Sequence, residues 1–198
     1  PVHLTIDAAL KKRDVLGGTA PQQVQDAMAK ASTRKSKKSR KVGDMTVKVV
    51  PACIDHVDAI CKLVDYWAVH GENLPRSRDE IVESLTDFGV ALHKEQVIGC
   101  GCLHLYTSTL AEIRSLGVDP EHKGHGIGSR MVEYFLDCAR RLHIRRVFVL
   151  TRAPEFFTRN GFQVVPIDTL PEKVFKDCLK CNKRECCDEI AMICELNT

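Results

Sequence analysis

The sequence of 198 residues predicts an α/β fold, in which helices pack on a β-sheet. Residues 110–118 form an apolar stretch that reads as a strand. A second stretch has apolar residues at helical spacing, namely Met131, Val132, Phe135, Leu136 and Ala139. A glycine-rich turn, residues 123–128, joins the two stretches. The pattern therefore predicts a strand that leads through a tight turn into an amphipathic helix.

The N-terminal part of the chain is much more basic than the rest. Residues 1–45 contain ten Lys/Arg and four Asp/Glu, whereas residues 46–198 contain 19 and 22. Within the first part, residues 32–41 include no apolar residue, so we expect a solvated, flexible basic linker over 32–45. A nucleic-acid-binding arm is the alternative, but no aromatic residues interleave with the charges. We therefore expect no nucleic-acid partner.

Residues 1–31 have a helical signal of their own. Thr19 is placed to cap a helix that runs to about Ala31, with Gln22 at capping-box spacing and Pro21 in the first turn. The stretch from Ala9 to Ala31 resembles the extreme C-terminus of argininosuccinate lyase. This resemblance implies that residues 1–31 are the remnant of a lyase domain fused to the rest of the chain, in a protein that forms a homo-oligomer. An unrelated capped helix is the alternative.

Residues 46–198 are expected to form one domain with alternating helices and strands. Asp55 and Ser77 are the expected N-caps of its first two helices, and Glu80 gives the second helix capping-box spacing. The order β-α-α-β-β-β-α-β-α-β-β follows from strands expected at 46–50, 88–93, 97–105, 109–118, 146–151, 162–165 and 190–196, and from helices after Asp55, after Ser77, after the glycine turn and at 154–160.

The glycine turn predicts an anion site. Gly124, Gly126 and Gly128 can adopt backbone angles closed to other residues and let main-chain amides approach a ligand. Free N–H groups at a helix start, reinforced by the helix dipole, favour a phosphate or diphosphate. A dinucleotide fold places its turn after the first strand of a βαβ unit, and a P-loop ends in Gly-Lys-Ser/Thr. Neither pattern is present, and an ordinary helix-entry loop stays as the alternative.

The turn and the element order resemble those of the GNAT acyltransferase superfamily. Its pattern is Gln/Arg-x-x-Gly-x-Gly/Ala, and this chain has Lys123-Gly124-His125-Gly126-Ile127-Gly128, with Lys in place of the usual Gln or Arg. The resemblance implies a mixed, mostly antiparallel sheet flanked by helices, with acetyl-CoA as co-substrate. The implied acetyl-CoA-binding residues are Leu116, Val118, Lys123, Gly124, His125, Gly126, Ile127, Gly128 and Ser129.

Residues 46–196 further resemble short-form N-acetylglutamate synthases. The stretches that carry this resemblance include Leu-Pro-Arg-Ser at 74–77, Ala-Glu-Ile-Arg-Ser-Leu at 111–116 and Arg-Val-Phe-Val-Leu-Thr at 146–151. They imply direct acetyl transfer to the α-amino group of L-glutamate, a step of arginine biosynthesis. An acetyltransferase for another amine, such as glutamine or a protein N-terminus, is the first alternative. A catalytically silent acyl-CoA-binding or assembly module is the second.

Acetyl transfer to an amine needs a proton acceptor, an oxyanion donor and a group that assists the departing thiolate. The resemblance implies Glu112 as the base, the main-chain N–H of Val118 as the oxyanion donor and Thr151 as the partner of the thiolate. Strand alternation places Glu112, Arg114 and Leu116 on one face unless a bulge intervenes. A structural surface pair between Glu112 and Arg114 is the alternative to a catalytic role for Glu112.

Guanidinium groups suit a substrate with two carboxylates, because their planar fork makes paired hydrogen bonds. Arg76 matches the carboxylate-binding arginine of the resembling synthases. Arg114 and Arg152 are further candidates for contacting the acceptor.

Ten cysteines occur in the chain, and five of them lie near its end. Cys178 and Cys181 have the spacing of a metal-binding pair, which Cys186 or Cys187 would complete as a structural zinc site. A second Cys-x-x-Cys is missing, so reduced thiols are favoured. Cys53, Cys61, Cys100, Cys102 and Cys138 are expected to be small core residues. No apolar run has the length of a membrane span and no signal segment opens the chain, so we expect a cytoplasmic protein.

Overall fold

The computed structural model describes residues 45–180 and 186–196. The expected helix ending near Ala31, residues 32–44 of the expected linker, and Cys181 lie outside this range. None of the helices in the described ranges combines the length and the apolar character that a membrane span requires.

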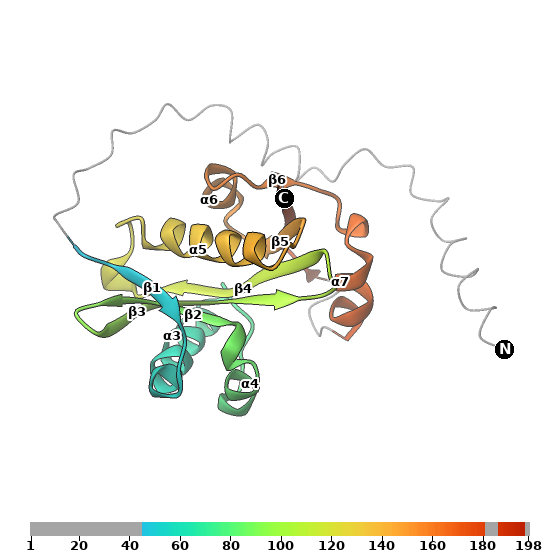
Figure 1. Ribbon diagram of the computed structural model, residues 1–198. Coiled ribbons are helices and arrows are strands. Elements are labelled where there is room, and N and C mark those ends of the chain that lie inside the picture. The colour runs from blue at the N-terminus through green and yellow to red at the C-terminus, as the bar shows by residue number, and fades with distance from the viewer. Residues whose placement is uncertain (1–44, 181–185, 197–198) are drawn as a thin grey trace, which may run out of the picture. The chain divides into compact units, whose positions relative to one another are not determined.

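The described residues form one seven-stranded sheet with the order β1-β2-β3-β4-β5-β7-β6 (Figure 1). The strands are β1 (Lys48–Pro51), β2 (Phe88–His93), β3 (Gln96–Leu105), β4 (Leu110–Val118), β5 (Arg146–Thr151), β6 (Gln163–Val164) and β7 (Ile190–Glu195). Neighbouring strands are antiparallel except for β4 and β5, which are parallel. The expected α/β architecture with a mixed, mostly antiparallel sheet is confirmed.

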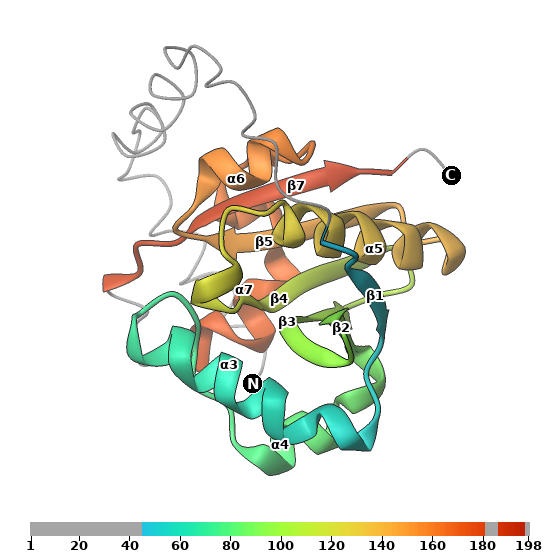
Figure 2. The ribbon, with the colours of Figure 1, turned by 90° about the vertical axis from the view of Figure 1, so that its left-hand side faces the viewer.

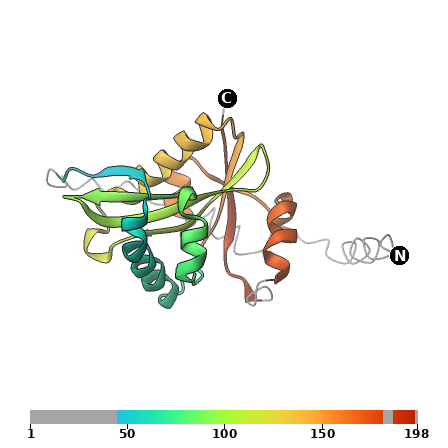
Figure 3. The same ribbon diagram turned by 60° about the horizontal axis from the view of Figure 1, so that its bottom comes forward.

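Helices cover both faces of the sheet. They are α3 (Val57–Val69), α4 (Arg78–Glu83), α5 (Ile127–Arg141), α6 (Pro154–Arg159) and α7 (Pro171–Lys176). In Figure 1, α5 and α6 lie above the sheet and α3 and α4 below it. Figure 2 shows β7 beside β5, with α6 next to β7. With the underside turned forward, Figure 3 shows α7 at a different part of the sheet from α3 and α4.

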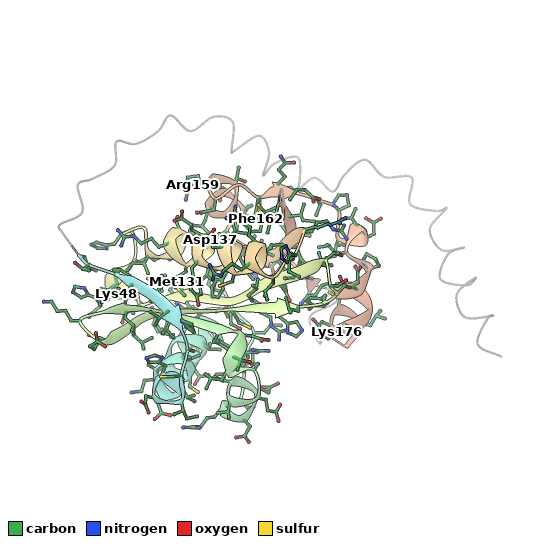
Figure 4. All side chains as sticks on the ribbon, viewed as in Figure 1. Lys48, Met131, Asp137, Arg159, Phe162 and Lys176 are labelled. Atoms are coloured by element: carbon green, nitrogen blue, oxygen red, sulfur yellow. The ribbon has the colours of Figure 1, made fainter. Side chains whose placement is uncertain are left out.

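Apolar side chains divide between these two faces. Under α5, Met131 and Phe135 pack on Ala111, Ile113 and other buried residues, and Figure 4 shows Met131 on the side of α5 that faces the sheet. On the opposite face, residues of α3 such as Ile60 and Val64 pack on β2 and β3. The alternation of β4 thus sends Ala111 and Ile113 towards α5 and leaves Glu112 for the opposite face.

Local sequence signals account for several element ends. Ser77 caps α4 as expected, and its side chain accepts a hydrogen bond from the Glu80 N–H while Glu80 Oε2 accepts one from the Ser77 N–H. The expected cap at Asp55 is wrong. Asp55 lies inside a 3₁₀ helix (Ile54–His56) that precedes α3, because the Cys53 N–H donates to His56 Nδ1 and forms a turn there. Cys53 is also exposed rather than part of the core.

Helix α7 was not expected from the sequence. It has only six residues and begins at Pro171, so it is too short to show helical periodicity. The segment nevertheless brings charged side chains against β4, because Leu170 just before it is fully buried with Leu110 and Phe148. That anchor places α7 beside the centre of the sheet.

Candidate active site

The centre of the sheet is where β4 and β5 separate. Their parallel pairing covers Leu110–Glu112 of β4 and Arg146–Phe148 of β5. Beyond Glu112, β4 continues to Val118 paired with β3, whereas β5 continues to Thr151 paired with β7. The two strands therefore diverge, and beyond Glu112 the only strand paired with β4 among the described residues is β3. The edge of β4 opposite β3 has no strand partner there.

The main chain of Val118 points towards this divergence. The Asp119 N–H donates to the Ile98 carbonyl at 2.9 Å, which makes Val118 and Gly99 a pair that exchanges no hydrogen bonds in the antiparallel ladder. The N–H and C=O of Val118 thus point away from β3. The carbonyl accepts a hydrogen bond from Trp67 Nε1 of α3 at 3.0 Å. The strand geometry fits the expected orientation of the Val118 N–H.

A bulge in β4 changes the face of Leu116. The register between β3 and β4 shifts between Cys100 and Cys102, and Ser115 has a positive φ of 52°. Leu116 consequently packs with the cluster under α5, so the exception allowed for a bulge applies and Leu116 does not share a face with Glu112 and Arg114. Because of the bulge, Arg114 and Leu116 lie on opposite faces of the sheet although they are two residues apart.

The glycine turn has the backbone geometry of an open helix start. Gly124 and Gly126 have φ values of 86° and 72°, and Gly126 is the left-handed N-cap of α5. No side chain of the described residues caps this helix start, and a Cβ on either glycine would meet no atom within 4 Å. The start of α5 therefore lacks a side-chain cap among the described residues and has open space beside two of its glycines, as an anion site requires.

Residues around the turn have distinct contacts. Gly128 is needed for packing, because a Cβ there would lie 3.1 Å from the Phe156 ring. Lys123 places its ammonium 4.8 Å from the centre of the Trp67 ring, and His125 Nδ1 lies 3.2 Å from the Lys123 carbonyl. Ile127 is buried and Ser129 is partly buried. The seven expected residues from Lys123 to Ser129 thus form one continuous segment at the start of α5.

Glu112 lies in a buried cluster of charges. Its side chain is 4% exposed, and Lys173 Nζ of α7 lies 3.0 Å from Glu112 Oε1. Tyr106, just after β3, donates its hydroxyl to Glu112 Oε2 at 3.0 Å or to Asp177 Oδ2, with which it also forms a hydrogen bond. The alternative of a surface pair between Glu112 and Arg114 is therefore wrong, because Glu112 is buried and its partners are Lys173 and Tyr106.

The protonation states of this cluster follow from its contacts. Burial, together with the carboxylates of Glu112 and Asp177, raises the pKa of Tyr106 above its usual range. Burial acts to lower the pKa of Lys173, but the same two carboxylates outweigh it and the pKa is raised. Burial acts to raise the pKa of Asp177, but hydrogen bonds from Tyr106 and Lys173 bring it below its ordinary value. At neutral pH the phenol and the ammonium are protonated and Asp177 is ionised.

Two arginines lie near Cys102 on the sheet face that carries Glu112. The Nη1 of Arg76 and the Nε of Arg114 are buried, and neither has a hydrogen-bond partner among the described residues. Both guanidinium groups lie near Cys102: burial raises the pKa of this thiol to about 11, while the charges of Arg114 and Arg76 act to lower it. The Cys102 thiol is thus protonated at neutral pH. Arg76 and Arg114 retain buried N–H donors on the face that carries Glu112.

Arg152 and Thr151 have partners within the protein. Arg152 donates to Asp188 at 2.7 Å and to the Gly71 carbonyl at 2.6 Å, and lies 3.6 Å from Glu189. Thr151 is buried at the end of β5, where its hydroxyl oxygen accepts a hydrogen bond from the Ala153 N–H at 2.9 Å. Arg152 therefore differs from Arg76 and Arg114, because carboxylates of the chain itself already neutralise its charge.

The four cysteines considered as zinc ligands are only partly described. Cys178 is partly buried and Cys186 and Cys187 are exposed, whereas Cys181 lies outside the described residues. Within the described ranges, no group of three or more His, Cys, Asp or Glu side chains is arranged to hold a metal ion.

Sequence reasoning missed Tyr106, Lys173 and Asp177 as members of the site. The i, i+4 spacing of Lys173 and Asp177 was a signal, since such a pair forms on one face of a helix. It was not sufficient, because only the fold shows that this face meets Glu112.

Comparison with known proteins agrees with this geometry. A model of the acetyltransferase (GNAT) family matches residues 60–162, which is more than half of the chain. The chain belongs to the GNAT acetyltransferase family. Its mixed sheet flanked by helices is the fold of GNAT acyltransferases, and the domain is an acyltransferase.

Several relatives extend over most of the described domain. An uncharacterized N-acetyltransferase of Chlorobaculum tepidum is 42% identical over 135 residues, which cover 68% of this chain and 87% of the relative. An amino-acid acetyltransferase of Mycobacterium tuberculosis is 42% identical over 125 residues, 61% of this chain and 71% of the relative. The match to an amino-acid acetyltransferase of Ralstonia nicotianae, at 32% identity, covers 27% of that longer protein.

Two solved structures have the same fold. A Mycobacterium tuberculosis protein in complex with CoA and NLQ has a TM-score of 0.68 and 35% identity, covering 76% of this chain and 99% of that one. The N-acetylglutamate synthase from Neisseria gonorrhoeae, complexed with coenzyme A and N-acetyl-glutamate, has a TM-score of 0.71 and 27% identity. That match covers 79% of this chain and 37% of the synthase chain.

Proposed function

We propose that this GNAT domain transfers the acetyl group of acetyl-CoA directly to the α-amino group of L-glutamate. The observation that carries the proposal is the convergence of a buried carboxylate, Glu112, and two arginines with free buried donors on one face, next to the divergence of β4 and β5. Amino-acid acetyltransferases among the relatives, and the N-acetylglutamate synthase among the structural neighbours, support the choice of acceptor.

Acetyl-CoA would bind along the edge of β4 and the start of α5. The diphosphate would accept hydrogen bonds from the free N–H groups that come after Gly126, and Lys123 would add a positive charge. Leu116 and Val118 would line the path to the thioester, and residues 123–129 would hold the phosphates. The open space at Gly124 and Gly126 supports this fit, because a ligand can approach the backbone there.

The chemistry would then use groups at the strand divergence. Glu112 would take a proton from the acceptor ammonium, directly or through a water molecule. The Val118 N–H would donate to the thioester oxygen as negative charge develops on it. Thr151 would assist the departing thiolate, since its hydroxyl can donate a proton while its oxygen accepts from Ala153.

Recognition of glutamate would rest on charge. Arg76 and Arg114 have buried N–H groups that a carboxylate of the acceptor would satisfy, which removes the free-energy cost of leaving them unpaired. Arg152 would contribute less to recognition of the acceptor, because its pairing with Asp188 and Glu189 neutralises its charge. Arg76 and Arg114 would therefore discriminate glutamate from amines that lack a side-chain carboxylate.

An acceptor screen tests this function. The purified protein is mixed with acetyl-CoA and, in turn, L-glutamate, L-glutamine and a peptide with a free N-terminus, and release of the CoA thiol is recorded. We expect the highest kcat/KM with L-glutamate. A preference for glutamine or the peptide would assign another acceptor, and no thiol release with any amine would indicate a silent binding module.

We further propose that residues 1–31 are the end of an argininosuccinate lyase domain and that residues 32–45 link it to the acetyltransferase domain of residues 46–198. The resemblance of the Ala9 to Ala31 stretch supports this arrangement. A test is to sequence the gene upstream of Pro1 and to assay the complete product for argininosuccinate cleavage. A product that lacks lyase residues upstream would overturn the proposed fusion.

A further inference from the structure

The buried base has a hydrogen-bonded connection to the protein surface. Glu112 is 4% exposed, whereas the Asp177 side chain is 34% exposed. Between them lies the hydroxyl of Tyr106, which hydrogen-bonds both Glu112 Oε2 and Asp177 Oδ2. These three groups therefore form a continuous path from the centre of the sheet to solvent.

Lys173 stabilises the whole path. Its ammonium lies 3.0 Å from Glu112 Oε1, 3.3 Å from Tyr106 Oη and 3.0 Å from Asp177 Oδ2. A cation at this position attracts negative charge on either carboxylate. The Lys173 ammonium therefore offsets the negative charge of Asp177 when Glu112 holds the proton, and that of Glu112 when Asp177 holds it.

A proton taken up by Glu112 has to leave before the amine attacks. A carboxylic acid is ordinarily several pKa units more acidic than the α-ammonium group of an amino acid, so a proton left on the carboxyl group returns readily to the amine. A carboxylate that is almost fully buried exchanges poorly with bulk water. A route that carries the proton away would keep the acceptor amine in its nucleophilic form.

We propose that Tyr106 and Asp177 relay this proton from Glu112 to solvent. The inference rests on the proposed function, in which Glu112 takes a proton from the acceptor. Protonated Glu112 gives its proton to Tyr106 Oη while the phenol gives its own proton to Asp177 Oδ2, and Asp177 then releases it to water. No phenolate forms, and for each proton that enters at Glu112 one proton leaves from Asp177. Tyr106 and Asp177 act through Glu112 and are positioning and relay residues.

The electrostatics of the path agree with its direction. Because the pKa of Tyr106 is raised, the phenol keeps a proton and can pass one on only as it receives another. Because the pKa of Asp177 is lowered, that carboxyl group gives up a proton readily to water. The two properties disfavour storage of the proton at the relay, because the phenol does not ionise and Asp177 holds an added proton only briefly before releasing it.

The Tyr106→Phe variant removes the bridging hydroxyl and retains the ring, which packs near Phe148 and His104. We expect kcat with glutamate to fall on the order of tenfold, part of the ~10²–10⁴ that positioned proton transfer contributes, with little change in either KM. Added imidazole, a small diffusible base, should restore much of the lost kcat. Tyr134→Phe on α5, whose hydroxyl is not part of the path, is the matched control and should behave like the parent.

The second variant, Asp177→Asn, removes the outer acceptor and should show the same fall in kcat and the same restoration by imidazole. A parent-like kcat in both variants overturns the relay, as does a loss that imidazole leaves unchanged. A rise in the KM for glutamate at unchanged kcat would also overturn it, because it indicates a binding role. If the parent protein itself releases no thiol with glutamate, the proposed function fails instead.

Discussion

The glycine turn and the Glu112 cluster are two parts of one site that are built in opposite ways. The turn is a single stretch, and its ligand-facing groups are main-chain N–H donors made available by Gly124 and Gly126. The cluster is assembled from side chains of three separate segments, namely Tyr106, Glu112 and the α7 pair of Lys173 and Asp177. The turn is open to solvent, whereas the cluster is buried at Glu112 and Lys173 and reaches solvent only at its outer end, Asp177.

This contrast indicates which kind of function each part can perform. Open main-chain donors suit a large anion that must enter and leave, because they need no partner within the protein. Buried side-chain charges suit proton transfer, because their partners fix their position and their protonation state. Four predictions test this division, in order of decreasing effect.

The first prediction concerns the cluster. Glu112→Gln removes the proposed proton acceptor, so we expect kcat with glutamate to fall by about 10²–10⁴ while the KM for acetyl-CoA stays close to that of the parent. Steady-state thiol release measures both. The control is Glu133→Gln on the exposed side of α5. Turnover of Glu112→Gln equal to that of the control would remove Glu112 as the base.

The second prediction concerns the arginines beside the cluster. Arg76→Gln and Arg114→Gln should each raise the KM for glutamate about tenfold to a hundredfold, because a hydrogen bond to a charged group contributes about 1.5–3 kcal/mol. Arg78→Gln is the control, since Arg78 is exposed and pairs with Asp58. If all three variants give the same KM for glutamate, the acceptor is recognised elsewhere.

The third prediction concerns the turn. Gly126→Ala forces a Cβ into left-handed backbone at a cost of about 1–2 kcal/mol, and the displaced N–H groups should raise the KM for acetyl-CoA several-fold. Gly161→Ala is a matched control, because Gly161 also has a positive φ and open space around it. Both variants should lose similar thermal stability. An equal rise in KM for both would show that the turn has no special role in binding.

The fourth prediction concerns the outer end of the cluster. The folded-state pKa of Asp177 lies below its ordinary value of 3.8, so its stabilising effect is present above pH 3.8 and is lost as the pH falls through the lower, folded value. Asp177→Asn should therefore be less stable than the parent above that pH, and the difference should shrink in acid. Denaturant unfolding over a pH series measures this. Asp168→Asn, at an exposed position, is the control variant.

Local signals predicted several elements correctly. The expected strands 88–93 and 146–151 have the observed bounds of β2 and β5, because alternating or continuous apolar runs between polar turns specify short strands. The capping box from Ser77 to Glu80 was also correct, because both of its hydrogen bonds join residues three apart. Each of these signals depends on residues close together in the chain.

Other features could not be predicted because they depend on distant residues. The bulge at Ser115 moves Leu116 to the opposite face, and it arises where β4 shifts register against β3. The guanidinium of Arg152 resembled those of Arg76 and Arg114 in the sequence, but the fold places Asp188 and Glu189 against it. A residue type alone therefore did not show whether a charge is free to bind a ligand.

The order of residues along the chain was enough to specify the strand, the glycine turn and the helix after it, because backbone conformation is set largely by each residue and its near neighbours. Only the tertiary structure determined that Lys173 and Tyr106 are the partners of Glu112. An ion pair or a hydrogen bond between distant segments exists only where folding brings their atoms within about 3 Å, and the buried Leu170 is what holds α7 there.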